Sequence, residues 1–172
     1  VAVMHRVTDT FGPIPYSQIG ADGALSTPYD SEEKVYNTFF DELDAAIKTL
    51  NEHPNELLTS TADYVYGGDV KKWIKFANSL RLRLAMRVSN VNKALAASEA
   101  KKALENSYGV IESSAENIQI SGKGYQNPLA GVAGWGETYM GATMASVLNG
   151  YEDPRISIYY SPATLADHTE EY

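Results

Sequence analysis

The chain has 172 residues, of which 44% are hydrophobic and 21% are charged, so it has the composition of an ordinary globular protein and the length to bury a core. Its 22 acidic and 14 basic residues give a formal net charge of −8, which argues against a nucleic-acid-binding protein because phosphates are bound by positive surfaces. The absence of cysteine excludes disulfides, thiolate metal sites and a cysteine nucleophile from this segment.

Targeting signals are missing from the sequence. No apolar run approaches the roughly 18 residues that a membrane-spanning helix needs. No signal-peptide pattern is present, and the first residue is Val1 rather than methionine. We therefore interpret the sequence as an internal piece of a longer protein, with any targeting sequence or lipid-anchoring cysteine upstream.

The first thirty residues predict the end of a helix followed by a loop. Residues 1–12 suit the helical end, after which Pro13 and Pro15 impose an extended backbone as far as Ser17. Glycine, proline and small polar residues over positions 17–30 are typical of a loop.

A second helix is predicted to begin at Asp30, which has capping-box spacing to Glu33. Its apolar residues recur at helical spacing: Val35, Phe39, Leu43, Ala46, Ile47 and Leu50. Another face is acidic and carries Asp41, Glu42 and Asp44. These carboxylates could act as a general acid and base, but nothing nearby supplies a nucleophile or a desolvating pocket. We interpret them as a solvated or ion-paired helix face.

The clearest helical period runs over residues 70–88. Asp69 follows two glycines and suits the N-cap, after a short extended apolar piece at 64–68. Four large apolar residues on one face are predicted to be buried: Trp73, Phe76, Leu80 and Leu84. The basic residues of this helix are expected to pair in part with the acidic helix before it.

Another helix is predicted over residues 93–107, anchored by Leu95 and Leu104, with Gly109 at its C′ position. The break at residues 89–92 makes it the partner of 70–88 in an antiparallel helical hairpin. The size of this pair suits one tetratricopeptide-like unit, although the formal repeat signature is not evident.

The last third of the chain has a different character. Short extended pieces are predicted at 110–114 and 117–120, followed by an exposed, mobile glycine-rich loop at 121–136. An amphipathic helix follows at about 137–148 and is closed by Gly150. Asp153, Pro154 and Arg155 predict a turn with a local ion pair rather than a catalytic or anion-binding pair.

The glycine-rich loop and the helix after it carry the candidate ligand-binding residues, which are Tyr125, Asn127, Trp135 and Tyr139. Flat aromatic rings stack on the apolar faces of sugar rings, and amides hydrogen-bond to hydroxyls, so this set suits glycan capture. The alternative is that Trp135 and Tyr139 pack into the core or against a partner.

No catalytic, metal or cofactor motif is present. The three histidines, His5, His53 and His168, are far apart and lack metal-ligand spacing. No nucleophile elbow or dinucleotide fingerprint occurs, and Gly122-Lys123-Gly124 lacks the rest of a phosphate loop. We therefore predict no catalytic residue, no metal site and no cofactor.

Four segments in order resemble the SusD/RagB-like family, the outer-membrane nutrient-binding lipoproteins of Bacteroidetes. The most specific is Gly68–Arg87, GD-x-x-KW-x-x-FANSLRLRLAMR. The others are Asp9–Ser17 with the pattern D-x-FG-x-I-PYS, the stretch from Tyr29 to Leu50, and Asp153-Pro154-Arg155 before Tyr159 and Tyr160. The resemblance covers residues 1–160.

The resemblance implies a mainly α fold of tetratricopeptide-like helical hairpins with long irregular loops. Residues 1–172 would then be part of a single SusD-like domain whose N- and C-terminal portions are missing. It also implies a surface-exposed lipoprotein, anchored in the outer membrane outside this segment, that captures oligosaccharides or other nutrients. The implied partner is a SusC-like TonB-dependent transporter, and the implied role is not enzymatic and involves no nucleic acid.

Two other classes remain open at this point. The first is a helical-repeat scaffold that binds a protein partner and has no role with sugars. The second is a glycosidase, which would need two carboxyl groups about 5–9 Å apart across one cleft.

Overall fold

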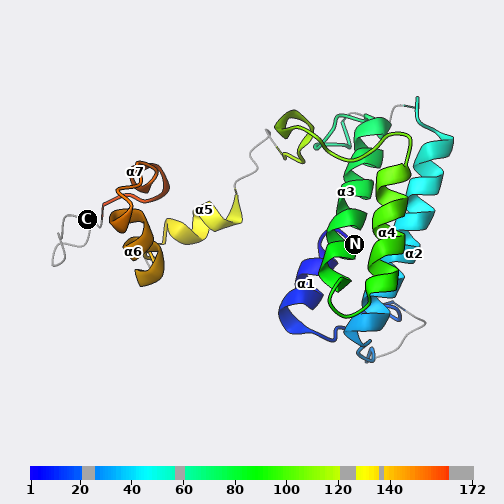
Figure 1. Cartoon of the computed structure of the whole chain (residues 1–172), viewed down its shortest axis with the longest axis horizontal. Coiled ribbons are helices and arrows are strands. Elements are labelled where there is room, and N and C mark those ends of the chain that lie inside the picture. The colour runs from blue at the N-terminus through cyan, green and yellow to red at the C-terminus, as the bar shows by residue number, and fades with distance from the viewer. Residues whose placement is uncertain (21–25, 57–60, 121–126, 136–137, 163–172) are drawn as a thin grey trace. The chain divides into compact units, whose positions relative to one another are not determined.

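The computed structural model describes residues 1–20, 26–56, 61–120, 127–135 and 138–162. Within these ranges the chain is helical and has no β-strand, which confirms the predicted mainly α class. The chain divides into two compact units, Val1–Ser121 and Gly122–Tyr172 (Figure 1). No helix of the described ranges is both long enough and apolar enough to cross a membrane.

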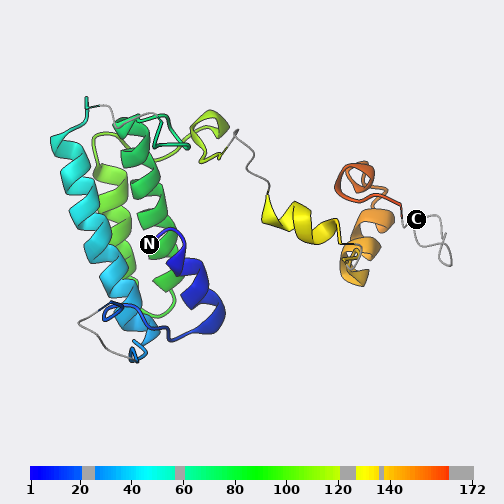
Figure 2. The ribbon, with the colours of Figure 1, turned by 180° about the vertical axis from the view of Figure 1, so that it is seen from behind.

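The first unit is a bundle of α-helices. Its helices are α1 (Met4–Phe11), α2 (Glu32–Glu52), α3 (Val70–Val88) and α4 (Lys93–Glu105). The last three lie side by side along their lengths, as the two opposite views agree, and α3 contacts both α2 and α4 (Figures 1 and 2). The helices α3 and α4 form the predicted antiparallel hairpin.

The core of this unit forms where the apolar faces of α2, α3 and α4 meet. Phe39 and Leu43 of α2 pack with Leu80 and Leu84 of α3, and the small side chain of Ala96 brings α4 close. All five are buried, so the predicted burial of Leu80 and Leu84 is confirmed.

Trp73 and Phe76, which we also predicted to be buried, are only partly covered. The Trp73 ring packs edge-on against Tyr66 and Phe76, with ring centroids 5.2 and 5.8 Å away. Its indole N–H donates to the Asp63 carboxylate at 2.8 Å. An indole N–H needs a hydrogen-bond partner, so Trp73 lies at the margin of the core, where a carboxylate reaches it.

Asp63 organises the turns before α3, where we had predicted an extended piece. Its carboxylate accepts the backbone N–H groups of Val65, Tyr66 and Gly68. Desolvation raises the pKa of Asp63, but the Trp73 N–H and these backbone donors outweigh it and lower the pKa to about 2. Asp69 caps α3 as predicted, accepting from the backbone N–H of Lys72 at 3.2 Å.

The predicted start of α2 was wrong by one residue. Ser31 is the N-cap and accepts from the Lys34 backbone N–H at 3.3 Å. Asp30 is buried, and its carboxylate accepts from Ser17 N–H at 2.6 Å and Lys34 Nζ at 2.5 Å. Its own N–H donates to Ile14 O at 2.9 Å, so Asp30 ties the proline-rich segment to α2 instead of capping it.

Of the two predicted anchors of α4, Leu95 packs against the core and is confirmed, whereas Leu104 is wrong. Leu104 is 58% exposed, and the buried residues Ala96 and Ala103 contact the core in its place. Small side chains let two helix backbones approach closely, which leaves a leucine on the outer face. The helix ends at Glu105, and Gly109 lies in a later turn at φ +68°, not at C′.

Residues 110–120 form no β-strand, although Ser113 and Asn117 have the extended backbone that was predicted for these pieces. They run along α3, where Ser79 Oγ accepts from Ile111 N–H at 2.8 Å and Lys75 pairs with Glu116 at 2.5 Å. A short 3-10 turn, η1 (Ser114–Glu116), lies within this stretch. These contacts hold the segment against α3, and the Glu116 carboxylate also accepts from the Glu112 backbone N–H at 3.0 Å.

The second unit contains α5 (Pro128–Ala133), α6 (Ala142–Gly150) and α7 (Ile156–Tyr159). The predicted loop at 121–136 therefore includes a helix, begun by an Asn127 cap and a proline at the first helical position. The helix predicted at 137–148 begins at Ala142 and contains Gly150 instead of stopping before it. Of this unit's described residues, only Leu148 is buried.

Candidate functional site

The candidate ligand-binding residues lie at the start of the second unit. Tyr125 falls outside the described residues. Asn127 is the N-cap of α5, and its Oδ1 accepts from the Leu129 backbone N–H at 3.0 Å. The amide oxygen that we assigned to a ligand is therefore already used to begin a helix.

Trp135 follows α5 directly and presents its ring to solvent. The side chain is 72% exposed, and its backbone N–H donates to Val132 O at 3.2 Å. The sequence left open whether Trp135 is buried in the core. In this unit it is not buried. An exposed indole just after a short helix is a suitable flat surface for an apolar ligand face.

Tyr139 lies close to the same helix. The neighbouring Thr138 hydroxyl donates to Val132 O at 3.1 Å, which turns the chain back towards α5. The Tyr139 side chain is 61% exposed. Trp135 follows α5, and Tyr139 follows Thr138, which is hydrogen-bonded to α5. Both aromatic side chains are exposed.

Sequence reasoning missed the helix that carries this surface. Its signal was present in the dipeptide Asn127-Pro128, since asparagine is a preferred cap and proline a preferred first helical residue. Leu129 and Val132 of α5 are also exposed apolar residues.

The Asp153–Arg155 pair is local, as predicted. The Asp153 carboxylate accepts from the backbone N–H and Nε of Arg155, both at 2.9 Å, and the guanidinium also reaches its second oxygen. The Arg155 guanidinium and this backbone N–H lower the pKa of Asp153 to about 2. Asp153 and Arg155 pair with each other within one turn of the chain, which does not favour a role for either in proton transfer.

Two of the three carboxylates on the acidic face of α2 have partners, and Asp41 is exposed. Asp44 contacts Arg81 of α3 and Lys102 of α4, and Glu42 accepts from the Tyr16 hydroxyl at 2.7 Å. This confirms the expected pairing of the basic α3 with the acidic helix before it. Desolvation raises the pKa of Asp44, but Lys102 and Arg81 outweigh it and lower the pKa below its usual value.

The histidines lie apart in the described chain. His5 is buried in α1, His53 faces Glu56 with Nδ1 2.8 Å from Oε1, and His168 is outside the described residues. Within the described ranges no three acidic or imidazole side chains gather as metal ligands would.

The chain belongs to the SusD-like family. The family described as "Susd and RagB outer membrane lipoprotein" matches it over residues 1–172. A comparison with curated proteins found no match.

Solved structures of SusD homologues are similar to most of the chain. A homologue from Bacteroides vulgatus is 67% identical, with a TM-score of 0.82 over 98% of this chain and 34% of its own. A chitin-binding SusD homologue from Flavobacterium johnsoniae is 40% identical, with a TM-score of 0.85 over 98% of this chain and 36% of its own. A Bacteroides uniformis homologue is 44% identical, with a TM-score of 0.76 over 90% of this chain and 33% of its own. The chain therefore spans about a third of the length of these relatives.

Proposed function

We propose that this protein is a cell-surface glycan-binding lipoprotein that captures oligosaccharides and passes them to a SusC-like TonB-dependent transporter. It binds its sugar and does not cleave it. Residues 1–172 form part of a single SusD-like domain, and the lipid anchor that holds the protein at the outer membrane lies outside them. Membership of a family of outer membrane lipoproteins supports this proposal.

Chitin oligosaccharides are the first ligand to test. Two of the similar structures, at 40% and 34% identity, are described as chitin-binding. In this chain the single observation that carries the proposal is the exposed indole of Trp135, with Tyr139 on the adjoining segment. Aromatic faces bind the C–H face of a pyranose ring and tolerate different sugars, which suits capture ahead of transport.

The experiment is calorimetric titration of the 172-residue chain with a panel of chitin, starch and xylan oligosaccharides. Trp135→Ala should weaken binding by about tenfold or more, since an exposed aromatic anchor contributes mainly to binding. Its melting temperature should not change, because the ring covers no core.

Tyr151→Ala is the matched control, because Tyr151 is an aromatic residue of the same unit that is also exposed. It should leave affinity within about twofold, the scale of a surface substitution outside the site. A Trp135→Ala protein that binds as tightly as the control, or that melts several degrees lower, contradicts the assignment.

A scaffold that binds a protein partner is the second candidate. It is favoured by Met144 and Val147, two apolar side chains exposed on α6. If the protein is such a scaffold, calorimetric titration should detect no oligosaccharide binding to the parent chain, to Trp135→Ala or to Tyr151→Ala. Met144→Lys would then remove binding of the partner and leave the melting temperature unchanged.

A further inference from the structure

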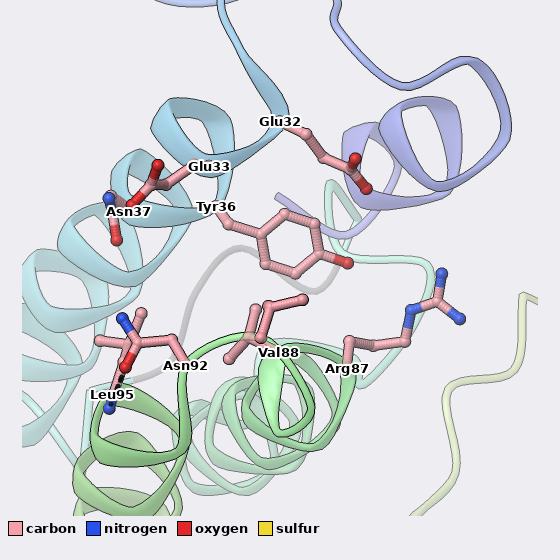
Figure 3. Close-up of a pocket in the computed structure, with 9 residues that line it drawn as sticks. Glu32, Glu33, Tyr36, Asn37, Arg87, Val88, Asn92 and Leu95 are labelled. Carbon is pink, nitrogen blue, oxygen red and sulfur yellow. Dashed lines mark hydrogen bonds between the residues drawn. The ribbon is translucent and has the colours of Figure 1, made fainter.

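The first unit contains a cavity of about 440 Å³ that the assignment above does not use. It opens between the first two turns of α2, the end of α3, and the turn that leads into α4 (Figure 3). Its volume lies within the range of small-molecule sites, towards the lower end. This size suits a single sugar residue rather than a long polymer segment.

The back wall of the cavity is apolar and fixed. Figure 3 shows the Tyr36 ring above Val88, with Leu95 to one side. Tyr36 and Val88 are buried, and Leu95 packs against the core. A wall of this kind contacts the C–H face of a ring without moving.

One carboxylate holds the polar edge of this wall in place. Asp9 of α1 accepts from the Tyr36 hydroxyl at 2.5 Å and pairs with Arg87 at 3.0 Å. Burial and this hydrogen bond raise the pKa of Tyr36 to about 12, so the hydroxyl remains a donor. The positive charge of Arg87 is thus already paired with the Asp9 carboxylate when no ligand is bound.

The opposite side carries hydrogen-bonding groups without protein partners in the described chain. Glu33 and Asn37 lie one turn apart on α2, facing the side of the cavity that Asn92 and Leu95 line (Figure 3). The Asn92 Oδ1 caps α4 through the Leu95 N–H at 3.0 Å, which leaves its NH₂ group as a donor. The cavity thus offers a hydrogen-bond acceptor in the Glu33 carboxylate, both a donor and an acceptor in the Asn37 amide, and a donor in the Asn92 NH₂ group.

Charge limits the class of ligand. Glu32 and Glu33 line the cavity, and the one cation there, Arg87, is matched by Asp9. A ligand with a carboxylate, sulfate or phosphate group would meet a negative field, whereas hydroxyls and acetamido groups would find donors and acceptors.

We propose that this cavity is a second sugar-binding site, which takes one non-acidic sugar residue with its ring against Tyr36 and Val88. The inference rests on the proposed glycan-binding function. The sugar hydroxyls bond to Glu33, Asn37 and Asn92. The site uses residues of the first unit, whereas Trp135 belongs to the second, and it accepts a single residue, such as a chain end.

The test is an NMR titration of the isotopically labelled 172-residue chain carrying Trp135→Ala, which removes the other candidate surface. N-acetylglucosamine should shift the side-chain NH₂ signals of Asn37 and Asn92 in the millimolar range, and glucuronic acid should not. Asn37→Ala should weaken N-acetylglucosamine binding by about tenfold, as expected for lost hydrogen bonds. Asn51→Ala, an exposed asparagine of the same helix outside the cavity, is the matched control and should bind unchanged.

A second variant tests the role of charge. Glu33→Gln should raise the affinity for glucuronic acid, whereas Glu52→Gln at the other end of α2 should not. Shifts confined to residues outside the cavity, or equal binding of the two sugars in the parent chain, overturn this proposal. If chitin oligosaccharides lose affinity with Trp135→Ala while N-acetylglucosamine leaves Asn37 and Asn92 unmoved, only the cavity assignment fails. If the cavity binds and Trp135→Ala has no effect, only the Trp135 assignment fails.

Discussion

Arg81 is 3% exposed, and its side chain lies among charged groups at the interface of α2, α3 and α4. It pairs with Asp44 of α2, and its Nε is 3.4 Å from Oε2 of Glu99, a residue of α4 that is equally buried. Lys102 joins both carboxylates, at 2.9 Å from Asp44 and 2.7 Å from Glu99. A guanidinium with several donors suits such a shared position better than an ammonium would.

Replacing Arg81 with methionine should lower the free energy of unfolding by roughly 3–5 kcal/mol, because a buried carboxylate loses a countercharge. The decrease should lie near the lower end of this range, because Lys102 still pairs with Glu99. Urea denaturation measures the free energy of unfolding of each variant. Arg83→Met, two residues away on an exposed position of the same helix, should change stability by no more than about 0.5 kcal/mol. Equal midpoints for the two variants would show that the network contributes nothing.

At the scale of the element, α3 is the helix that contacts both α2 and α4. It contacts α2 and α4 through one face, and its other side holds Ile111 and Glu116 of the following segment. Its last turn supplies Arg87 and Val88 to the cavity. Most of the stability of such a helix comes from this packing rather than from its intrinsic propensity.

Leu84 tests this packing directly, because its side chain is fully buried on the second-last turn of α3. Leu84→Ala should destabilise the chain by about 2–5 kcal/mol through lost burial and the cavity left behind. Thermal or urea unfolding followed by circular dichroism measures the change. Met86→Ala, on the exposed side of the same helix, should stay within about 0.5 kcal/mol of the parent. A Leu84→Ala protein as stable as Met86→Ala would refute the assigned core.

At the scale of the whole molecule, the two units differ in how much they bury. The first has a core that draws on three helices, whereas the described part of the second buries only Leu148. Local stability follows buried apolar contact, so the units should open independently and at different free energies.

Hydrogen exchange followed by mass spectrometry should therefore show slow exchange for the amides of α3 and fast exchange for those of α5 and α6. Ligand addition provides a further comparison. If Trp135 is in the binding site, chitin oligosaccharides should slow exchange near α5 and leave α3 unchanged. Equal protection of both units in the free chain would contradict the difference in burial.

The sequence by itself determined the features that depend on residues close together in the chain. The helix over 70–88 follows from its apolar period and the Asp69 cap, and the Asp153–Arg155 turn from groups two residues apart. The four ordered motifs identified the family that the comparison confirms over the whole chain. These predictions succeeded because the interactions involved lie within one or two helical turns.

Tertiary structure decided what depends on distant neighbours. Asp30 became a buried acceptor because Ser17 reaches it, and Leu104 faces outward because Leu95 and two alanines make the contact of α4 with the core. Trp73 stays at the margin because Asp63 accepts its indole N–H. The cavity joins Tyr36 to Arg87, which the sequence separates by most of two helices and a loop. Periodicity assigns a side chain to a face of its own helix, whereas the packing of other helices decides whether that face is buried, paired with a charge or left open to a ligand.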